Sequence, residues 1–196
     1  MLNTSATGGY LLQGDPKPVE GQALRRFLHG LLVGVSGLPT TLVRPSWQPN
    51  PPPIPDIDTD WLAFGISAVR PEAGDPYYRQ LDTGEGLTIR HEAIDVACTF
   101  YGPNAVGNAG ALRDGMYLGQ NRENLYLAGM GLVGFSDTIH APELINDRFF
   151  DRADITMTLR REVRRTYPIL HFVAAYGTIH ANRAITTLHR DWEVNP

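Results

Sequence analysis

The sequence predicts an α+β fold, in which a mostly antiparallel β-sheet is flanked by two or more helices and carries a long proline-rich arm. Three observations lead to this prediction. Apolar and polar residues alternate over residues 88–100 and 153–159, as in strands with one buried face. Residues 19–35 carry apolar residues at helical spacing. Strand patterns follow one another closely toward residue 194, which favours antiparallel hairpins.

The first helix is expected over residues 19–35. Arg25, Arg26 and His29 are turned away from its apolar face. Gly37 and Pro39 follow, and these residue types commonly end helices. The apolar positions are Leu24, Phe27, Leu28, Leu31, Leu32 and Val35.

Residues 44–60 form the proline-rich arm. Six of the eleven residues from Pro45 to Pro55 are proline. Because proline fixes φ and lacks a backbone donor, this segment cannot form a helix or a central strand. The segment contains two large apolar residues, Trp47 and Ile54, and Trp61 directly follows it, and a disordered linker has little use for such anchors. We therefore expect the arm to be pinned against its own domain or against a neighbouring copy.

The middle of the chain predicts two strands and a second helix. Residues 61–69 are short and apolar and read as a strand, whereas residues 72–86 lack a period and read as a surface excursion. The strand at residues 88–100 is broken by residues 102–103, after which a helix extends to about residue 120. The buried face of that strand holds Ile94, Val96, Cys98 and Phe100, and the helix buries Ala105, Ala109, Leu112 and Met116.

The C-terminal half predicts further strands. Residues 130–135 read as a short strand, and residues 153–159 alternate between apolar and polar positions. Residues 169–179 are apolar at nearly every position, which is typical of a strand covered on both faces. Residues 184–194 read as a weaker final strand.

Length and composition favour one soluble domain. We expect a single domain over residues 1–196, with extensions at residues 1–18 and 183–196. The formal charge of −4 argues against a protein whose main task is to grip nucleic acid. No segment reads as a signal peptide or as a membrane span, so a cytoplasmic origin is expected. Cys98 is the only cysteine, which makes an intrachain disulfide impossible and favours a buried thiol.

The choice of basic residues is unusual. Of the 17 lysine and arginine residues only Lys17 is lysine. A GC-rich genome would favour arginine codons and would explain this bias. Extensive contact between subunits would explain it too, because arginine is enriched and lysine depleted at protein interfaces.

No motif supports an active site. Gly129, Gly131 and Gly134 match the dinucleotide-binding glycine pattern, but the required strand before it and helix after it are not predicted, so a bend or close backbone packing is expected. The aspartates at 56, 58 and 60 resemble a calcium loop that lacks its glycine and its closing glutamate, so turn and cap roles are expected. The histidines and serines fit no metal or nucleophile motif. We expect no enzyme activity, no cofactor and no metal.

The segment LRREVRR at residues 159–165 carries a cluster of charges. The apolar alternation stops at Leu159, and the residues beyond it are charged on both faces of the strand, which indicates that the strand leaves the core. A solvated hairpin end is one interpretation. A projecting hairpin that meets carboxylates of an adjacent subunit, or passing phosphates, is the other.

Several blocks occur in an order that resembles the neck or tail-terminator family of tailed bacteriophages. The blocks are VRPSWQPNPPPIP, TDWLAFGI, HEAIDVACTFYGPNA, FFDRADITMTLRREVRRTYPI and HFVAAYGTIHA. The likeness extends from about Ala23 to Ala181. The Trp-Gln-Pro and Arg-Ala-Asp blocks are its most distinctive parts.

The resemblance implies a structural protein of the virion. Such subunits form a ring, typically hexameric, that terminates the tail tube and joins it to the head connector protein, while genomic DNA passes through the lumen without sequence-specific binding. The partners would be further copies of the chain, the tail-tube protein and the connector. The resemblance supplies no catalytic residue, which agrees with the failed motif search.

The residues themselves suggest where subunits meet. A ring of heterologous contacts needs two different complementary surfaces on each copy, and interface hot spots favour tryptophan and arginine. Another neck component, such as a head-completion, collar or gateway protein, is the nearer alternative, and a small enzyme or ligand-binding domain is the more distant one. The candidate interface residues are Arg44, Trp47, Trp61, Arg160, Arg161, Arg164 and Arg165.

Overall fold

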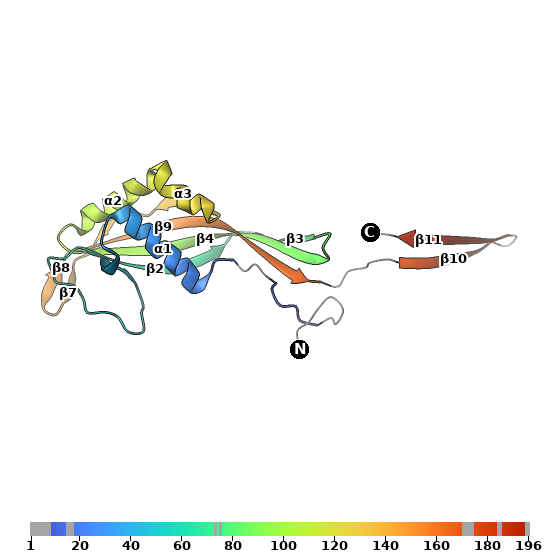
Figure 1. Ribbon diagram of the computed structural model, residues 1–196, viewed down its shortest axis with the longest axis horizontal. Coiled ribbons are helices and arrows are strands. Elements are labelled where there is room, and N and C mark those ends of the chain that lie inside the picture. Colours follow the sequence, from blue (N-terminus) through green and yellow to red (C-terminus); the bar gives the residue numbers. More distant parts are fainter. Residues whose placement is uncertain are drawn as a thin grey trace. The chain divides into compact units, whose positions relative to one another are not determined.

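The structure is a computed structural model, and it describes residues 9–14, 18–72, 74, 76–169, 175–183 and 186–194 (Figure 1). The chain divides into two compact units. The first comprises residues 1–17, 78–88 and 165–196; the second, called the core unit below, comprises residues 18–77 and 89–164. The single-domain organisation stays a prediction.

Helices and strands occur in separate runs along the chain, as expected of an α+β fold. The helices are α1 (Gly21–Ser36), η1 (Thr40–Leu42), α2 (Ala105–Tyr117) and α3 (Gly119–Leu127). The strands are β1 (Val43–Pro45), β2 (Trp61–Pro71), β3 (Tyr77–Gln80), β4 (Glu85–Tyr101), β5 (Met130–Phe135), β6 (Ile139–His140), β7 (Glu143–Ile145), β8 (Arg148–Phe150), β9 (Arg152–Pro168), β10 (Ala175–Arg183) and β11 (Thr186–Val194).

Seven strands form the main sheet, with the order β1-β2-β4-β9-β5, while β3 pairs with β4 and β6 pairs with β9. The β2–β4, β5–β9 and β6–β9 pairs are antiparallel, and the short β1 runs parallel to its neighbour β2. Side-chain contacts between β4 and β9 join residue 95 to 158 and residue 92 to 161. Between these two contacts the residue number decreases along β4 and increases along β9, so the central β4–β9 pair is antiparallel too. The predicted α+β class with a mostly antiparallel sheet is confirmed.

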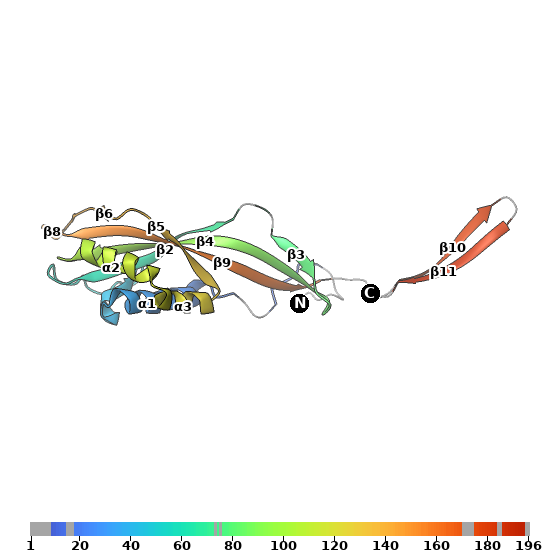
Figure 2. The same ribbon diagram turned by 90° about the horizontal axis from the view of Figure 1, so that it is seen from above.

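All three α-helices cover the same face of the sheet, as the view in Figure 2 shows. We call this the inner face and the opposite one the outer face. The alternation predicted for β4 and β9 places every second side chain in the core beneath the helices. The central core residues on the strands are Leu62, Phe64, Ile94, Val96, Cys98, Phe100, Ala153, Ile155, Met157 and Leu159.

The first helix follows its prediction closely. Leu24, Leu28, Leu31 and Leu32 are buried on one face. Gly37 adopts the left-handed conformation, with φ of 70°, and donates its N–H to the Val33 carbonyl. Glycine adopts this conformation without the steric cost that a Cβ would add, so the helix ends there.

The second predicted helix is two helices. Its buried stripe is confirmed: Ala105, Ala109, Leu112 and Met116 are all buried. The prediction of one helix to about residue 120 is wrong, because Leu118 has an extended ψ of 129° and α3 starts at the next residue. The Gly115 carbonyl accepts the Leu118 N–H at 3.2 Å and the Asn121 side-chain amide at 2.9 Å, so a hydrogen bond from the second helix helps to satisfy the end of the first.

Three strand predictions need smaller corrections. The arm was expected to begin at residue 44, but Val43–Pro45 forms the edge strand β1. The excursion at residues 72–86 contains β3, which pairs with β4. The strand expected at residues 169–179 begins at Ala175, with residues 170–174 outside the described part, and it forms an antiparallel pair with β11. Whether its side chains are covered also falls outside the described residues.

The largest correction concerns β9 beyond Leu159. We expected the strand to leave the core there, but Arg161 is 8% exposed and Val163 is 1% exposed. Arg161 lies on the inner face and binds Glu92, with 2.8 Å between Nε and Oε1. It also donates to the Val19 carbonyl just before α1, and the Glu20 carboxylate lies 3.7 Å away. A charge at a core position is tolerated here because a carboxylate and a backbone carbonyl satisfy the guanidinium.

The outer face of the sheet carries cross-strand ion pairs instead of an apolar layer. Asp95 accepts hydrogen bonds from Arg70 and from Thr158, the latter at 2.9 Å. Further along, Arg160 pairs with Glu72. The Arg70 guanidinium, followed by the Thr158 hydroxyl, holds the pKa of Asp95 below its ordinary value. Likewise the Arg160 guanidinium lowers the pKa of Glu72.

The buried pair predicts a large stability effect with an informative control. Replacing Glu92 by glutamine leaves the Arg161 charge without its main partner, so we expect Glu92→Gln to lower the free energy of unfolding by roughly 3 kcal/mol. The double variant Glu92→Leu/Arg161→Met removes both charges and should recover most of this loss. Urea unfolding followed by circular dichroism measures both. Equal stability of Glu92→Gln and the wild type would show that the pair does not form.

The outer-face pairs predict an acid-dependent loss of stability. A carboxyl whose pKa is lowered by folding stabilises the folded state while it is ionised, and this stabilisation is lost as the pH falls through the folded pKa. The wild type should therefore lose stability from about pH 4, the ordinary range of an aspartate, downward. Asp95→Asn should be less stable than the wild type at pH 7 and lose less on acidification. Parallel pH profiles of the two proteins, measured by urea unfolding, would contradict this role.

Candidate assembly surface

The start of the proline-rich arm lies against the outer face of the core unit. Residues 46–60 contain no helix and no strand, as expected from their prolines. The Ser46 N–H donates to the Phe64 carbonyl at 2.6 Å, which fixes the start of the arm to β2. The Trp47 ring lies directly on Gly65, where a Cβ would overlap it. Gly65 belongs to the outer face because its neighbour Phe64 is in the core.

Trp47 is held in an unusual conformation. Its φ of 55° lies in the left-handed region, which a bulky residue adopts only when its surroundings require it. Its side chain nevertheless stays 73% exposed. A large apolar ring that is fixed in place and remains in solvent is suited to contact another molecule.

Four side chains anchor the arm farther along the sheet, and we call them the arginine–aromatic stack (Arg44, Trp61, Tyr101 and Arg152). The rings of Trp61 and Tyr101 stack at 4.3 Å with an interplanar angle of 8°. The guanidinium of Arg44 lies 5.7 Å from the centre of the Trp61 ring, and that of Arg152 lies 6.0 Å from the Tyr101 ring. Such cation–π and ring contacts are each worth on the order of 1 kcal/mol.

Hydrogen bonds connect this stack to the arm and to the β7 strand. Arg44 donates to the Pro53 carbonyl at 2.6 Å and so ties the middle of the arm to β1. At the other end, Arg152 and the Tyr101 hydroxyl both donate to Glu143, at 2.9 and 3.1 Å. Burial, with the nearby Glu143 charge, raises the pKa of Tyr101 to about 12, so this hydroxyl stays a donor over the ordinary pH range.

The predicted interface residues therefore separate into different environments. Arg44 and Trp61 meet in the stack, where Trp61 is 9% exposed, and Trp47 lies nearby on the same face. Arg160 and Arg164 are exposed on the outer face, each paired with a carboxylate of its own chain.

Two of the predicted arginines have internal partners instead. Arg161 is buried in the core unit, as described above. Arg165 belongs to the first unit and donates to the Gln13 side chain at 2.6 Å. These two side chains thus help to hold the N-terminal part of the chain.

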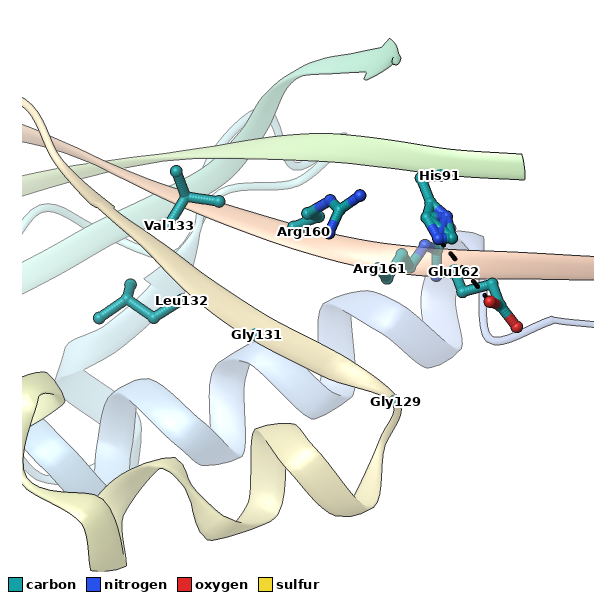
Figure 3. Close-up of a pocket in the computed structure, with 8 residues that line it drawn as sticks. All are labelled: His91, Gly129, Gly131, Leu132, Val133, Arg160, Arg161 and Glu162. Carbon is teal, nitrogen blue, oxygen red and sulfur yellow. Dashed lines mark ion pairs between the residues drawn. The ribbon is translucent and has the colours of Figure 1, made fainter. Parts of the chain in front are cut away.

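A shallow pocket of 290 Å³ lies beside Arg160 at the start of β5 (Figure 3). His91 and Glu162 face each other on its rim, 3.7 Å apart, and the backbone of β5 forms the opposite wall. The glycine pattern forms this wall: Gly129 has a φ of 69°, and the pairing with β9 shifts between Leu132 and Gly134. The bend expected from these glycines is confirmed.

The aspartates of the arm serve local structure. Residues 57–58 form a turn, and the Asp60 carboxylate accepts the N–H of Asn104, the residue before α2, at 2.9 Å. The expected turn and cap roles are confirmed. Within the described residues, no group of three or more histidine, cysteine, aspartate or glutamate side chains is arranged to hold a metal ion. In the same part of the chain, no helix is long and apolar enough to cross a membrane.

Sequence reasoning missed two parts of this surface. Tyr101 and Arg152 lie one residue beyond the predicted ends of their strands. Had the strands been extended by one residue, the alternation of side chains between the two faces would have placed both on the outer face. The second missed part is a set of exposed apolar side chains on the helix side of the sheet. The apolar residues of the segment 117–127 follow no regular spacing that could have predicted it. Its members are Tyr117, Leu118, Tyr126 and Leu127, between 55% and 80% exposed.

Comparison with known proteins identifies the family. The sequence model of the phage neck terminator proteins matches residues 22–183, a range that includes the arm and every strand of the main sheet. A search of curated proteins finds no match. Since the family model covers most of the chain, the protein belongs to the phage neck terminator protein family and is a structural protein of the phage neck.

Proposed function

We propose that the chain forms a ring, hexameric as in the family it resembles, that terminates the tail tube and joins it to the head connector protein. Genomic DNA would pass through the lumen of this ring without sequence-specific binding. The protein would be assembled in the host cytoplasm and remain in the virion. The whole chain would act as one domain with short terminal extensions.

The exposed Trp47 carries this proposal. A ring needs a surface on each subunit that fits a different surface on the next. The arm supplies a fixed apolar anchor on the outer face, held by Gly65 beneath it and by the arginine–aromatic stack beside it. Anchoring the arm before assembly reduces the conformational entropy that is lost when subunits associate.

Arg160 and Arg164 remain candidate contact residues. Both are more than half exposed, and each is paired with an exposed or half-exposed carboxylate that a partner's charge can replace. Exposed pairs of this kind contribute little to folding, so exchanging them costs little. Arg161 is a poor residue for testing assembly, because reversing its charge would disrupt the core.

The net charge of −4 suits the proposed lumen. A strongly basic channel would bind the phosphate backbone and slow the passage of DNA. The ion pairs of the outer face likewise compensate much of the positive charge of the arginines there.

The proposed function predicts a ring and a cap. Light scattering of the purified protein, alone and with purified tail tubes, should give the mass of a ring, and negative-stain images should show one cap at one end of each tube. A monomer that never decorates tubes would contradict the terminator role and favour another neck component. A ring that binds isolated head connectors but not tail tubes would also favour another neck component over a tail terminator.

The role of the arm predicts the effect of small substitutions. Trp47→Ala should prevent ring and cap formation while the circular dichroism spectrum and the unfolding midpoint stay close to the wild type, because this side chain is mostly exposed. Gly65→Ala should weaken assembly in the same direction, since the added Cβ displaces the Trp47 ring without touching the core.

A matched control is Phe149→Ala, which removes another exposed aromatic side chain, 70% exposed on β8. It should leave assembly unchanged. Rings and caps that form normally from Trp47→Ala would show that the arm is not a subunit contact.

A further inference from the structure

The arm carries unpaired acidic charge as well as apolar anchors. Asp56 and Asp58 are exposed, and in the part of the chain that the structure describes neither side chain has a hydrogen-bond or ion-pair partner. Ile54, two residues before Asp56, is 51% exposed. Together with Trp47, the arm therefore presents two apolar and two acidic side chains to solvent.

The helix side of the same unit carries the complementary features. Arg25 and Arg26 lie on the exposed side of α1, and among the described residues neither side chain has a hydrogen-bond or ion-pair partner. This distinguishes them from four arginines of β9, at positions 152, 160, 161 and 164, whose charges are compensated by carboxylates of their own chain. The helix layer also exposes Tyr126 at 57% and Leu127 at 80%, on the neighbouring helix α3.

We propose that the arm of one copy docks on the helix layer of the next copy, with Asp56 and Asp58 facing Arg25 and Arg26 and with Trp47 and Ile54 facing the exposed side chains of α3. This inference rests on the proposed function, which requires a ring, and it names the two surfaces that close it. A second copy is the occupant because both halves of the contact, complementary in charge and both apolar, occur on every copy.

The positions of the two surfaces support a head-to-tail contact. The helices cover the inner face of the sheet (Figure 2), whereas the Trp47 ring lies on Gly65 at the outer face, so the Trp47 anchor and the helix layer lie on opposite sides of the sheet. In an isologous dimer, two surfaces on opposite sides of the subunit cannot both contact the partner. They generate a ring when the rotation closes and a filament when it does not.

Charge reversal and charge exchange test the contact. Asp56→Arg/Asp58→Arg and Arg25→Asp/Arg26→Asp should each raise the concentration needed for half-assembly by roughly tenfold or more, because each places like charges opposite one another. Combining all four substitutions in one chain restores opposite charges and should return assembly toward the wild type. Light scattering over a concentration series measures this, and circular dichroism confirms that each variant is folded.

Mixing variants gives a second and sharper readout. An arm-defective copy still has a normal helix layer, and a helix-defective copy still has a normal arm. In an equimolar mixture of the two double variants, every arm meets an oppositely charged helix layer on an unlike copy and a like-charged one on its own kind. The mixture should therefore assemble into rings of alternating variants, although neither variant assembles well alone. A mixture that stays as defective as its two components would contradict the contact.

The outcomes separate the docking proposal from the proposed function. If both double variants form normal rings, or if the fourfold variant stays defective while its unfolding midpoint matches the wild type, the docking proposal is overturned and the neck ring stands. If the wild type forms no ring with or without tubes, the proposed function fails, and the docking proposal fails with it. Reversal of Asp82 and Glu85, two acidic residues outside the core unit, is the control and should leave assembly unchanged.

Discussion

The two unlike faces of the central sheet are the constraint on which the rest of the structure depends. Alternate residues of β4 and β9 place an apolar layer on the inner face, and this layer is buried by α1, α2 and α3. The outer face is left for polar and aromatic side chains, which form cross-strand pairs. The helices lie on the inner side, and on the outer side the Trp47 ring of the arm lies on Gly65. The sheet thereby gives one subunit two chemically different sides.

The arginine–aromatic stack turns a proline-rich segment into a fixed surface. Proline stiffens the arm but gives it few donors of its own, so its position depends on groups supplied by the sheet. Arg44 binds the Pro53 carbonyl and lies over Trp61, and Gly65 provides the gap for the Trp47 ring. The same arrangement leaves the Trp47 ring in solvent. This is the physical link between the fold and the proposed assembly of the neck.

Much of this architecture could be predicted from local patterns, and the failures have physical reasons. The buried stripe of α1 and the inner residues of β4 and β9 follow simple periods, so the sequence predicts them well. Arg161 was placed in solvent because a charge normally ends a buried strand, and its partners at Glu92 and Val19 are distant in sequence. The break at Leu118 and the Trp47–Gly65 contact also depend on tertiary neighbours. Nothing in a local pattern could reveal them.

The central claim is that the arm joins neighbouring copies in a ring at the phage neck. A cryo-electron microscopy reconstruction of that neck, at a resolution that shows tryptophan side chains, tests it most directly. The account predicts a ring of this chain on the last layer of the tail tube, with Trp47 of each copy buried against the helices of the next. A ring in which Trp47 stays in solvent, or a neck that lacks the chain, would contradict it.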